Sequence, residues 1–438
     1  MDIYYYDELT EKKYETLKNR SSSSIICDEV FNDVKKIAAD VKKKGNKAVL
    51  EYTEKFDKVF LNEEDLFVSI EEFKEAENRV NDEMKSVMTR AIESSKKYNQ
   101  SIQPANMETY TIGEGVLVGR KYDALESVAI YVPSGKGSYP SSFITTVVPA
   151  IVAGVKNITV IVPPNQDGSV DAALLVVANM LGVDRVFRAN GVAAIFAAAF
   201  GTETFKKVQM VVGPGSEYIM AAQLFVQMQG TKVPMFFGPS ECMIIADESA
   251  DSELVAADLI NEAEHGMHSS AILLTDSLCL AEKVKECVKN QLQNIPEWRR
   301  RFAQSASEIY GGIVIVQSIN QAIDVANEWG NEHIQIATKD AWEVAKKIKS
   351  ASEILVGQNT TFSAISYAIG VPACLPTGQF SRLYGGVTVD TFLKPSAITQ
   401  LSDIGLAGLK DVIKVMSEYE GFPAHTKSIL IREEKGII

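Results

Sequence analysis

The sequence is poor in histidine and cysteine, and it contains no long apolar segment. No run of about 18 apolar residues occurs, which excludes a helix long enough to span a membrane. The first residues carry neither a basic segment nor an apolar core, so we expect no secretory signal. The five cysteines include no C-x-x-C pair, which favours buried free thiols in a reducing compartment over disulfides. We therefore expect a cytoplasmic protein.

The charge of the chain excludes two classes of partner. The 438 residues carry a formal net charge of −13, and an acidic surface repels nucleic-acid phosphates and anionic lipids. Apolar residues make up 46% and charged residues 23%, as in an ordinary soluble enzyme that acts on a small molecule. The length predicts two or three packed units.

From residue 127 onward, short β-branched segments alternate with helical patterns. The predicted strands lie in 127–134, 157–164, 184–190, 208–216, 242–248, 271–277, 311–318 and 353–358. The predicted helices between them cover about 141–155, 168–181, 191–206, 251–265 and 278–292. This alternation is typical of βαβ units with parallel sheets buried on both faces. The sequence therefore predicts an α/β fold with two Rossmann-like parallel-sheet modules.

The regions before and after these modules are predicted to be helical. One helix is expected from Asp28, which could cap it, to Gly45, and a second over about 71–98. The predicted domains are an N-terminal arm over 1–25 with the serine run 21–24, a discontinuous first α/β domain over 26–130 plus 242–385, a second, cofactor-side α/β domain over 131–241, and a C-terminal helical segment over 386–438. We expect the early helices to pack on the sheet that follows residue 242, because they have no sheet of their own.

Histidine is the first place to look for chemistry, because its imidazole titrates near neutrality and binds metals. The four histidines are His265, His268, His333 and His425. Glu332 and His333 follow a predicted helix and precede a predicted strand, which we take as a βα-type loop position where catalytic groups gather. A carboxylate beside an imidazole supplies a base and an acid for a hydroxyl substrate. On spacing alone, however, a solvent-facing loop pair is the favoured interpretation.

Two other patterns point to a metal and a cofactor. Glu262 and His265 lie three residues apart on a predicted helix, so both could bind one metal ion. The alternative is structural, because a histidine near a helix end interacts favourably with the helix dipole. Glycine-rich turns at 131–142, 213–216 and 238–241 could approach a cofactor. No G-x-G-x-x-G motif follows a strand, so a simple strand–helix turn is equally consistent.

Taken together, a series of segments resembles histidinol dehydrogenase over nearly the whole chain. They are GNKAVLEYTEKFD (45–57), YVPSGKGSYPSSFITTVVPAIVAGV (131–155), GPGSEY (213–218), GPSE (238–241), VAADLINEAEHG (255–266), NEHIQI (331–336), CLPTG (374–378) and EGFPAH (420–425). The chain is therefore identified as a divergent member of that family.

The resemblance implies NAD-dependent oxidation of an amino alcohol through the aldehyde to the acid, as in histidine biosynthesis, an amino-acid biosynthesis pathway. It gives Glu332 the role of the base that acts on water and His333 that of proton donor and acceptor, with Asn331 in place of the motif's proline. It assigns substrate contacts to Ser240, Glu420 and His425. It also implies an intertwined homodimer, in which the C-terminal segment completes the partner's active site.

The resemblance is weaker at the predicted cofactor and zinc sites. Tyr131 stands where the family stacks NAD, whereas Ala193 and Ser216 replace a glutamine and an asparagine. Among the four zinc-ligand positions, His265 and His425 match, Glu262 replaces glutamine, and Ser366 replaces aspartate. Pro372 and Ala373 stand in place of a nearby Asn-His pair. NAD is expected, zinc could be held by three ligands and a water molecule, and the substrate could differ from histidinol.

Three functions are compatible with this pattern. An NAD-dependent oxidoreductase of the histidinol dehydrogenase type is favoured, because the Glu-His pair and both zinc-site histidines are retained. The alternatives are a metal-independent paralogue that oxidises a different polar alcohol and a non-catalytic binding protein on the same scaffold.

Overall fold

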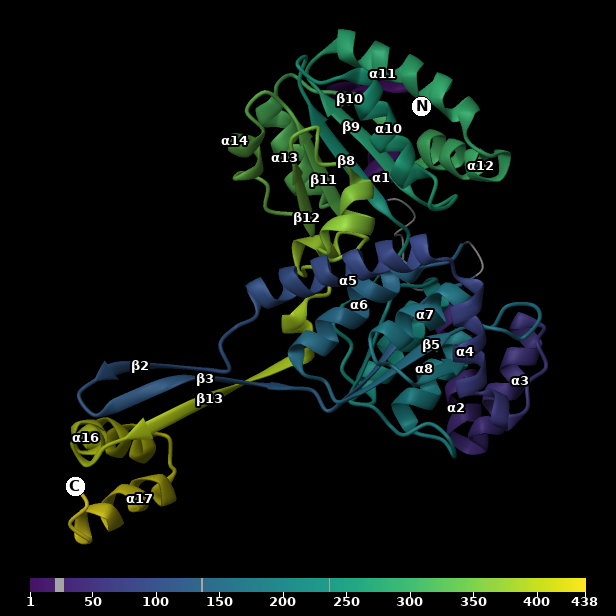
Figure 1. The fold of residues 1–438 in the computed structure, drawn as a ribbon. Coiled ribbons are helices and arrows are strands. Elements are labelled where there is room, and N and C mark those ends of the chain that lie inside the picture. Colours follow the sequence, from purple (N-terminus) through teal and green to yellow (C-terminus); the bar gives the residue numbers. More distant parts are fainter. Residues whose placement is uncertain (20–26, 135–136, 236) are drawn as a thin grey trace. The chain divides into compact units, whose positions relative to one another are not determined.

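The computed structural model divides into two compact units, Met1–Ile102 with Glu126–Thr391, and Gln103–Leu125 with Phe392–Ile438. It describes residues 1–19, 27–134, 137–235 and 237–438, so the serine run at 21–24 lies outside the described residues. The first unit contains two parallel sheets and the second an antiparallel sheet (Figure 1). Of the helices within the described residues, none combines the length and the apolar character that a bilayer crossing requires.

A six-stranded parallel sheet in the order β1-β10-β9-β8-β11-β12 forms one half of the first unit. Its strands are β1 (Ile3–Tyr5), β8 (Glu241–Ala246), β9 (Ser270–Thr275), β10 (Gly312–Ile315), β11 (His333–Ala337) and β12 (Glu353–Val356). The helices around it are α1 (Glu11–Asn19), α10 (Ser252–Ala263), α11 (Leu278–Gln291), α12 (Glu297–Ser305), α13 (Ile319–Trp329), α14 (Ala341–Ala345) and α15 (Phe362–Ala364).

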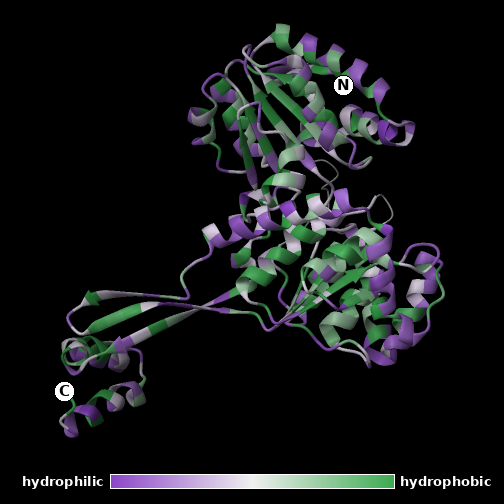
Figure 2. Cartoon of the chain, in the orientation of Figure 1, coloured by the Kyte–Doolittle hydropathy of each residue, from purple (hydrophilic) through white to green (hydrophobic). Residues whose placement is uncertain are grey.

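Both faces of this sheet are buried, and strand β8 shows why. Cys242 and Ile244 belong to the apolar core on one face, whereas Met243 and Ile245 belong to the core on the other. Successive side chains of a strand point to opposite faces, so a continuous apolar run serves both cores. Figure 2 shows the strands of this sheet mostly in the colour of hydrophobic residues.

A four-stranded parallel sheet in the order β6-β5-β4-β7 forms the other half of the first unit. Its strands are β4 (Ser127–Tyr131), β5 (Asn157–Val162), β6 (Val186–Arg188) and β7 (Met210–Val212), and its helices are α6 (Pro140–Ala153), α7 (Ala172–Met180), α8 (Gly191–Phe200) and α9 (Glu217–Met228). The predicted α/β fold with two parallel-sheet modules is therefore confirmed.

The first three of the early helices pack on the half with the four-stranded sheet and not on the sheet after residue 242, so that expectation is wrong for them, whereas the fourth contacts both α6 and the turn Ile365–Ile369. The four helices are α2 (Asp28–Lys44), α3 (Asn46–Asp57), α4 (Ile70–Arg79) and α5 (Asp82–Ile102). The apolar stripe of α2, which includes Val30, Val34 and Ile37, shares one core with Phe196 of α8 and Val226 of α9. The predicted domain boundaries themselves remain a proposal.

The helix expected over 71–98 is two helices. Val80 has extended backbone angles, φ −106° and ψ 125°, which end α4. The side chain of Asn81 then accepts a 2.8 Å hydrogen bond from the backbone N–H of Met84 in the first turn of α5. An asparagine that satisfies a free N–H group at a helix start favours a new helix there. The expectation that Asp28 caps α2 is wrong by one position, because Cys27 is the N-cap and Asp28 is the first helical residue.

Short helical turns connect several of these elements. The 3₁₀ turns are Tyr6–Glu8, Glu63–Asp65, Leu292–Asn294, Phe380–Arg382 and Val389–Phe392, and the π-helical turns are Ala306–Tyr310 and Ile365–Ile369. The predicted N-terminal arm contains one strand of the six-stranded sheet, because β1 pairs with β10 at its edge.

The second unit is built from three antiparallel strands and two helices. Strands β2 (Met107–Gly113), β3 (Val116–Ala124) and β13 (Leu393–Leu401) form a sheet in the order β13-β3-β2. They are followed by α16 (Asp403–Tyr419) and α17 (Pro423–Glu434). The segment 386–438, predicted to be helical, therefore begins with a strand that pairs with β3, whereas its helices from residue 403 agree with the pattern.

Candidate active site

Three neighbouring strands of the six-stranded sheet each begin with a titratable side chain. Glu241 begins β8, His333 begins β11 and Glu353 begins β12. Strand pairing sets His333 beside Cys242 on one side and Glu353 on the other. Glu332 lies between α13 and β11, and His333 is the first residue of β11, so the pair lies at the αβ connection and the amino end of the strand. The expected βα-type position, at a carboxyl end, is wrong.

Glu332 is buried and braced by the neighbouring strand. Its Oε2 accepts a 2.9 Å hydrogen bond from the backbone N–H of Glu241. Its backbone carbonyl accepts from the N–H groups of Ser352 and Glu353, at 3.0 and 3.2 Å. The side chains of His333 and Glu332 are 9% and 7% exposed. The solvent-facing loop pair, the alternative left open by spacing, is therefore excluded.

The imidazole of His333 lies between two carboxylates. Its Nδ1 is 3.4 Å from the carbonyl oxygen of Glu241 and 3.7 Å from Oε2 of Glu332. Its Nε2 is 3.6 Å from Oε2 of Glu353. The ring meets Phe362 edge to face, with 5.6 Å between the ring centroids. This environment holds the ring in one orientation and leaves no room for bulk water on its apolar side.

Burial lowers the pKa of His333, while the negative field of Glu262 and the backbone contact with Glu241 oppose that shift. A lowered pKa keeps the ring neutral near pH 7, which is the form that can accept a proton from a hydroxyl group. The chemical capacity of the site is therefore proton transfer, with a carboxylate and a neutral imidazole side by side.

No sequence pattern indicates that Glu353 lies at this site. Its burial, assisted by the charge of Glu262, raises the pKa of its carboxyl group to about 8. Neither a motif nor a helical spacing connects it with His333, and only the pairing of β11 with β12 brings the two together. Knowledge of the strand order would have been needed to find it.

The turn 238–241 and the segment 374–378, which were noticed separately in the sequence, are neighbours in the structure. The backbone N–H of Gly378 donates to Oε1 of Glu241 at 3.0 Å, and that of Gly238 donates to the hydroxyl of Thr377 at 2.6 Å. The partly buried Ser240 lies in this turn, and its carbonyl accepts from the N–H of Ser270 at 2.9 Å. The predicted substrate contact thus lies on a firmly held backbone next to Glu241.

Two of the predicted zinc ligands are brought together. Glu262 is buried on α10, and its Oε2 is 3.6 Å from Nδ1 of His265, just beyond the end of that helix. Ser366 lies, partly buried, in the turn Ile365–Ile369. Glu420 and His425 belong to the second unit, where both are exposed. The ring of His425 packs against that of Phe422, with 5.2 Å between the ring centroids.

Zinc sites take three or four protein ligands. Across the described ranges, no group of three or more histidine, cysteine, aspartate or glutamate side chains is arranged to hold a metal ion. The donor set of a single chain therefore fits zinc only in part.

Tyr131 lies at the carboxyl end of β4, where the order of the four-stranded sheet reverses between β4 and β7. Open α/β sheets bind ligands at such a reversal. Gly213 follows β7 at φ +140°, and a Cβ there would collide with the carbonyl oxygen of Tyr131. A Cβ on Gly191 would lie 2.6 Å from the tyrosine ring. Both positions therefore require glycine.

The other residues predicted on the cofactor side differ in their access to a ligand. Ser216 is exposed at the start of α9, whereas Ala193 is fully buried in α8. Tyr131 is itself buried, which raises the pKa of its hydroxyl group. The backbone of the turn 213–216 and the exposed Ser216 are thus more available to a cofactor than the face of the tyrosine ring.

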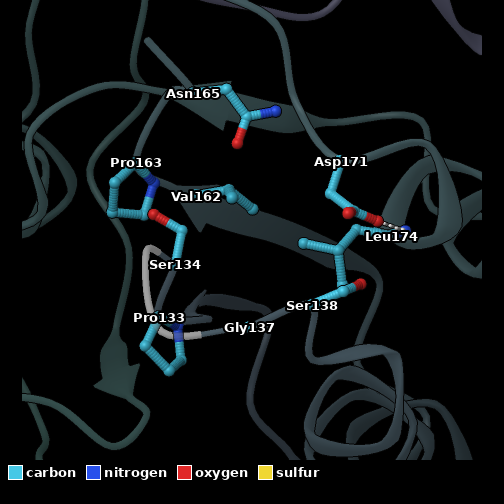
Figure 3. A pocket seen from close by; sticks show the side chains of 9 residues that line it. All are labelled: Pro133, Ser134, Gly137, Ser138, Val162, Pro163, Asn165, Asp171 and Leu174. Atoms are coloured by element: carbon cyan, nitrogen blue, oxygen red, sulfur yellow. Dashed lines mark hydrogen bonds between the residues drawn. The ribbon is translucent and has the colours of Figure 1, made fainter. Parts of the chain in front are cut away.

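A cavity of about 240 Å³ opens at the carboxyl ends of β4 and β5 (Figure 3). Its lining residues are Pro133, Ser134, Gly137, Ser138, Val162, Pro163, Asn165, Asp171 and Leu174. The carboxylate of Asp171 caps α7 by accepting from the N–H groups of Ala173 and Leu174, at 2.8 and 3.3 Å. This cavity lies at the carboxyl edge of the sheet, on the β5 side of β4 and not at the reversal between β4 and β7.

A second cavity, of about 480 Å³, is lined by residues of 248–253 and 277–283, beyond the carboxyl ends of β8 and β9. Neither of these two cavities is lined by Glu332 or His333.

Two parallel α/β sheets, a nucleotide-type strand reversal and a buried carboxylate–imidazole pair define an α/β oxidoreductase. The sequence model of the histidinol dehydrogenase family matches residues 19–433. The chain belongs to the histidinol dehydrogenase family, whose members are NAD-dependent oxidoreductases, and the resemblance found in the sequence is confirmed.

Similar proteins match over almost their entire lengths. A histidinol dehydrogenase from Synechocystis sp. is 41% identical, covering 98% of this chain and 99% of its own length. A histidinol dehydrogenase homolog from Colwellia psychrerythraea is 37% identical, covering 98% and 95%. The crystal structure of histidinol dehydrogenase from Elizabethkingia anophelis superposes with a TM-score of 0.93 at 32% identity, covering 99% of this chain and 98% of that one.

Proposed function

We propose that this chain oxidises an amino alcohol through the aldehyde to the acid, with Glu332 and His333 as its catalytic pair. The observation that carries the proposal is the burial of this pair beside Glu241, which holds both groups in one orientation. Taking a carboxylate and an imidazole out of water costs free energy, so the burial of both side chains at one place points to a chemical role.

His333 takes the hydroxyl proton. Its Nδ1 faces a carbonyl oxygen, which only accepts hydrogen bonds, so Nδ1 carries the ring proton and Nε2 is the free base. The lowered pKa keeps Nε2 available near neutral pH. NAD, when bound, accepts the hydride from the carbinol carbon.

Glu332 acts in the second oxidation. Its carboxylate, positioned by the N–H of Glu241, accepts a proton from water. The activated water then adds to the aldehyde carbonyl, and His333 lies close enough to exchange a proton with the resulting hydrate. Both oxidation steps thus use the same two side chains.

The cofactor and metal would be held by different parts of the chain. The turn 213–216 with Ser216, the ring of Tyr131 and the cavity beside Asp171 fit a dinucleotide, because glycine backbone and a helix N-terminus favour a pyrophosphate. Glu262 and His265 fit zinc if His425 of a second copy supplies a third ligand.

The second unit supports a homodimer with shared active sites. One face of α16 exposes large apolar side chains, namely Ile404, Val412, Val415, Met416 and Tyr419. Four of them recur at helical spacing, so they form one stripe, and exposed apolar stripes mark protein–protein contacts. Glu420 directly follows this stripe, so the same contact would bring it to the partner's site.

Of the two alternative functions, only the metal-independent paralogue is supported by a specific residue. Ser366 at a ligand position favours a metal-independent paralogue with a different polar alcohol as substrate. The non-catalytic binding protein is disfavoured, because such a protein has no need of a buried Glu-His pair. The cytoplasmic location expected from the sequence stays a prediction.

An activity screen tests the proposal. The purified chain is mixed with NAD and a panel of amino alcohols that includes histidinol, with and without added zinc, and NADH is followed by absorbance. Formation of NADH with at least one member supports the proposal. Absence of NADH with every member, in protein that is folded by circular dichroism, contradicts it.

A further inference from the structure

A carboxylate from the neighbouring strand faces the side of His333 that Glu332 does not. Glu353 begins β12 as the register partner of His333. Its Oε2 lies 3.6 Å from Nε2 of the imidazole. Within the described part of the chain, that oxygen is buried and accepts no hydrogen bond. A separation of 3.6 Å is too long for a hydrogen bond, so the carboxylate acts on the imidazole through its charge and leaves the Nε2 lone pair to the substrate hydroxyl.

We propose that Glu353 is a positioning residue for the oxidation, which holds the Nε2 side of His333 and stabilises the imidazolium that forms there. The inference rests on the proposed function. When the carbinol is oxidised, its O–H bond breaks and an N–H bond forms at Nε2, so a positive charge develops next to Glu353. In a site shielded from water, a fixed opposite charge stabilises that state strongly.

The electrostatic surroundings of Glu353 decide when this stabilisation acts. Burial first, and the charge of Glu262 second, raise the pKa of Glu353 to about 8. The carboxyl group is therefore mostly protonated below pH 8 and ionised above it. The titratable groups that face the pair are Glu332 directly before β11, Glu241 on β8, Glu262 and His265 of the α10 region, and Tyr98 on α5. The contribution of Glu353 to the oxidation should appear as the pH rises through about 8.

The test compares pH profiles of kcat/KM between pH 6 and 10 for the native chain, Glu353→Gln and Glu353→Asp. The native value should rise through about pH 8. Loss of one charge-assisted contact should leave Glu353→Gln about 10- to 100-fold below the native chain at pH 9. The gap should narrow below pH 7, where the native carboxyl group is itself uncharged. Glu353→Asp should restore the rise in part.

A matched control is Glu343→Gln, because Glu343 is exposed on α14 and pairs with the exposed Lys346 at 2.6 Å. Its profile should follow the native one. If Glu353→Gln lowers kcat/KM by the same factor at every pH, Glu353 has a structural role and the inference is overturned.

A measurement without turnover separates this inference from the proposed function. The chain has four histidines, so the imidazole resonances of ¹⁵N-histidine protein can be assigned by substitution. The resonances of His333 should shift near pH 8 in the native protein and not in Glu353→Gln. If the His333 resonances of the native protein do not shift near pH 8, the electrostatic coupling between Glu353 and His333 is refuted. If the resonances do shift but the protein forms no NADH, the coupling between Glu353 and His333 stands and only the proposed function is refuted.

Discussion

The carboxylate of Glu332 accepts a 2.9 Å hydrogen bond from the backbone N–H of Glu241 across the β8–β11 pair. Glu241 in turn accepts at its own carboxylate from the N–H of Gly378. The side chain expected to act as base is thus fixed to one strand and indirectly to the segment 374–378. A base held in this way needs little reorganisation when the reaction begins.

The first prediction concerns Glu332→Gln. The amide oxygen can still accept from Glu241, so the fold should be kept, whereas the amide cannot take a proton from water. The second oxidation should slow by about 10²- to 10⁴-fold, as is typical when a general base is removed. Aldehyde should accumulate, and the NADH formed per alcohol should fall from about two to about one, because each oxidation transfers one hydride. Product analysis by chromatography checks this, and unchanged acid formation would contradict the role of Glu332.

The second prediction concerns the shared active site. His333→Gln and His425→Ala should each be inactive as homodimers, because one lacks the base and the other a residue supplied to the partner. Chains mixed by co-expression form hybrids in which one site combines both defects and the other is intact. Random pairing should restore about a quarter of the native activity. No recovery in verified hybrid dimers would mean that each site is built from a single chain.

Much of the fold could be predicted from sequence, because its strands are buried on both faces. The runs around Met243 and Val160 are continuously apolar, and such runs fix a parallel strand without knowledge of its neighbours. The packing partner of α2 could not be predicted in the same way. Its stripe of Val30 and Val34 shows only that one face is buried, since any apolar surface would satisfy it.

The candidate site could likewise be predicted from the sequence only in part. Glu332 and His333 are adjacent in sequence, so they could be found without the structure. Glu353 could not, because it reaches His333 only through strand register. The antiparallel strands β2 and β13 were missed for another reason, since their side chains are mostly exposed and carry little apolar alternation.

The third prediction concerns zinc. From its resemblance to the family, the chain is predicted to carry Ser366 in place of an aspartate ligand, and a hydroxyl group is a weak zinc ligand compared with a carboxylate. Ser366→Asp should therefore raise the zinc affinity of the chain. Competition with a fluorescent zinc chelator measures the change, and His265→Ala should lower the affinity in the same assay. Equal affinity of Ser366→Asp and the native chain would show that residue 366 does not face the metal.

The fourth prediction concerns stability and pH. Asp258 is buried on α10 and accepts a 2.6 Å hydrogen bond from Gln335. Burial, with a smaller contribution from Glu262, raises the pKa of Asp258 to about 6 in spite of that hydrogen bond. The folded state therefore binds the proton more tightly than the unfolded state, whose pKa is near 3.8. Stability is consequently lost as the pH rises from about 4 to about 6.

Asp258→Asn should remove this loss, because asparagine can still accept from Gln335 but carries no charge. The variant should be more stable than the native chain by about 3 kcal/mol above pH 6. The difference should vanish near pH 4. Urea unfolding at pH 4, 5, 6 and 7 measures it, and a difference independent of pH would show that the charge of Asp258 is not the cause.

The most direct test of the whole account is a crystal structure of the native protein with NADH and an amino alcohol. If His333 takes the hydroxyl proton, the carbinol oxygen should lie about 2.6 to 3.2 Å from Nε2 of His333, the range in which a proton can be transferred. A substrate bound elsewhere, with His333 still enclosed by protein on every side, would contradict it.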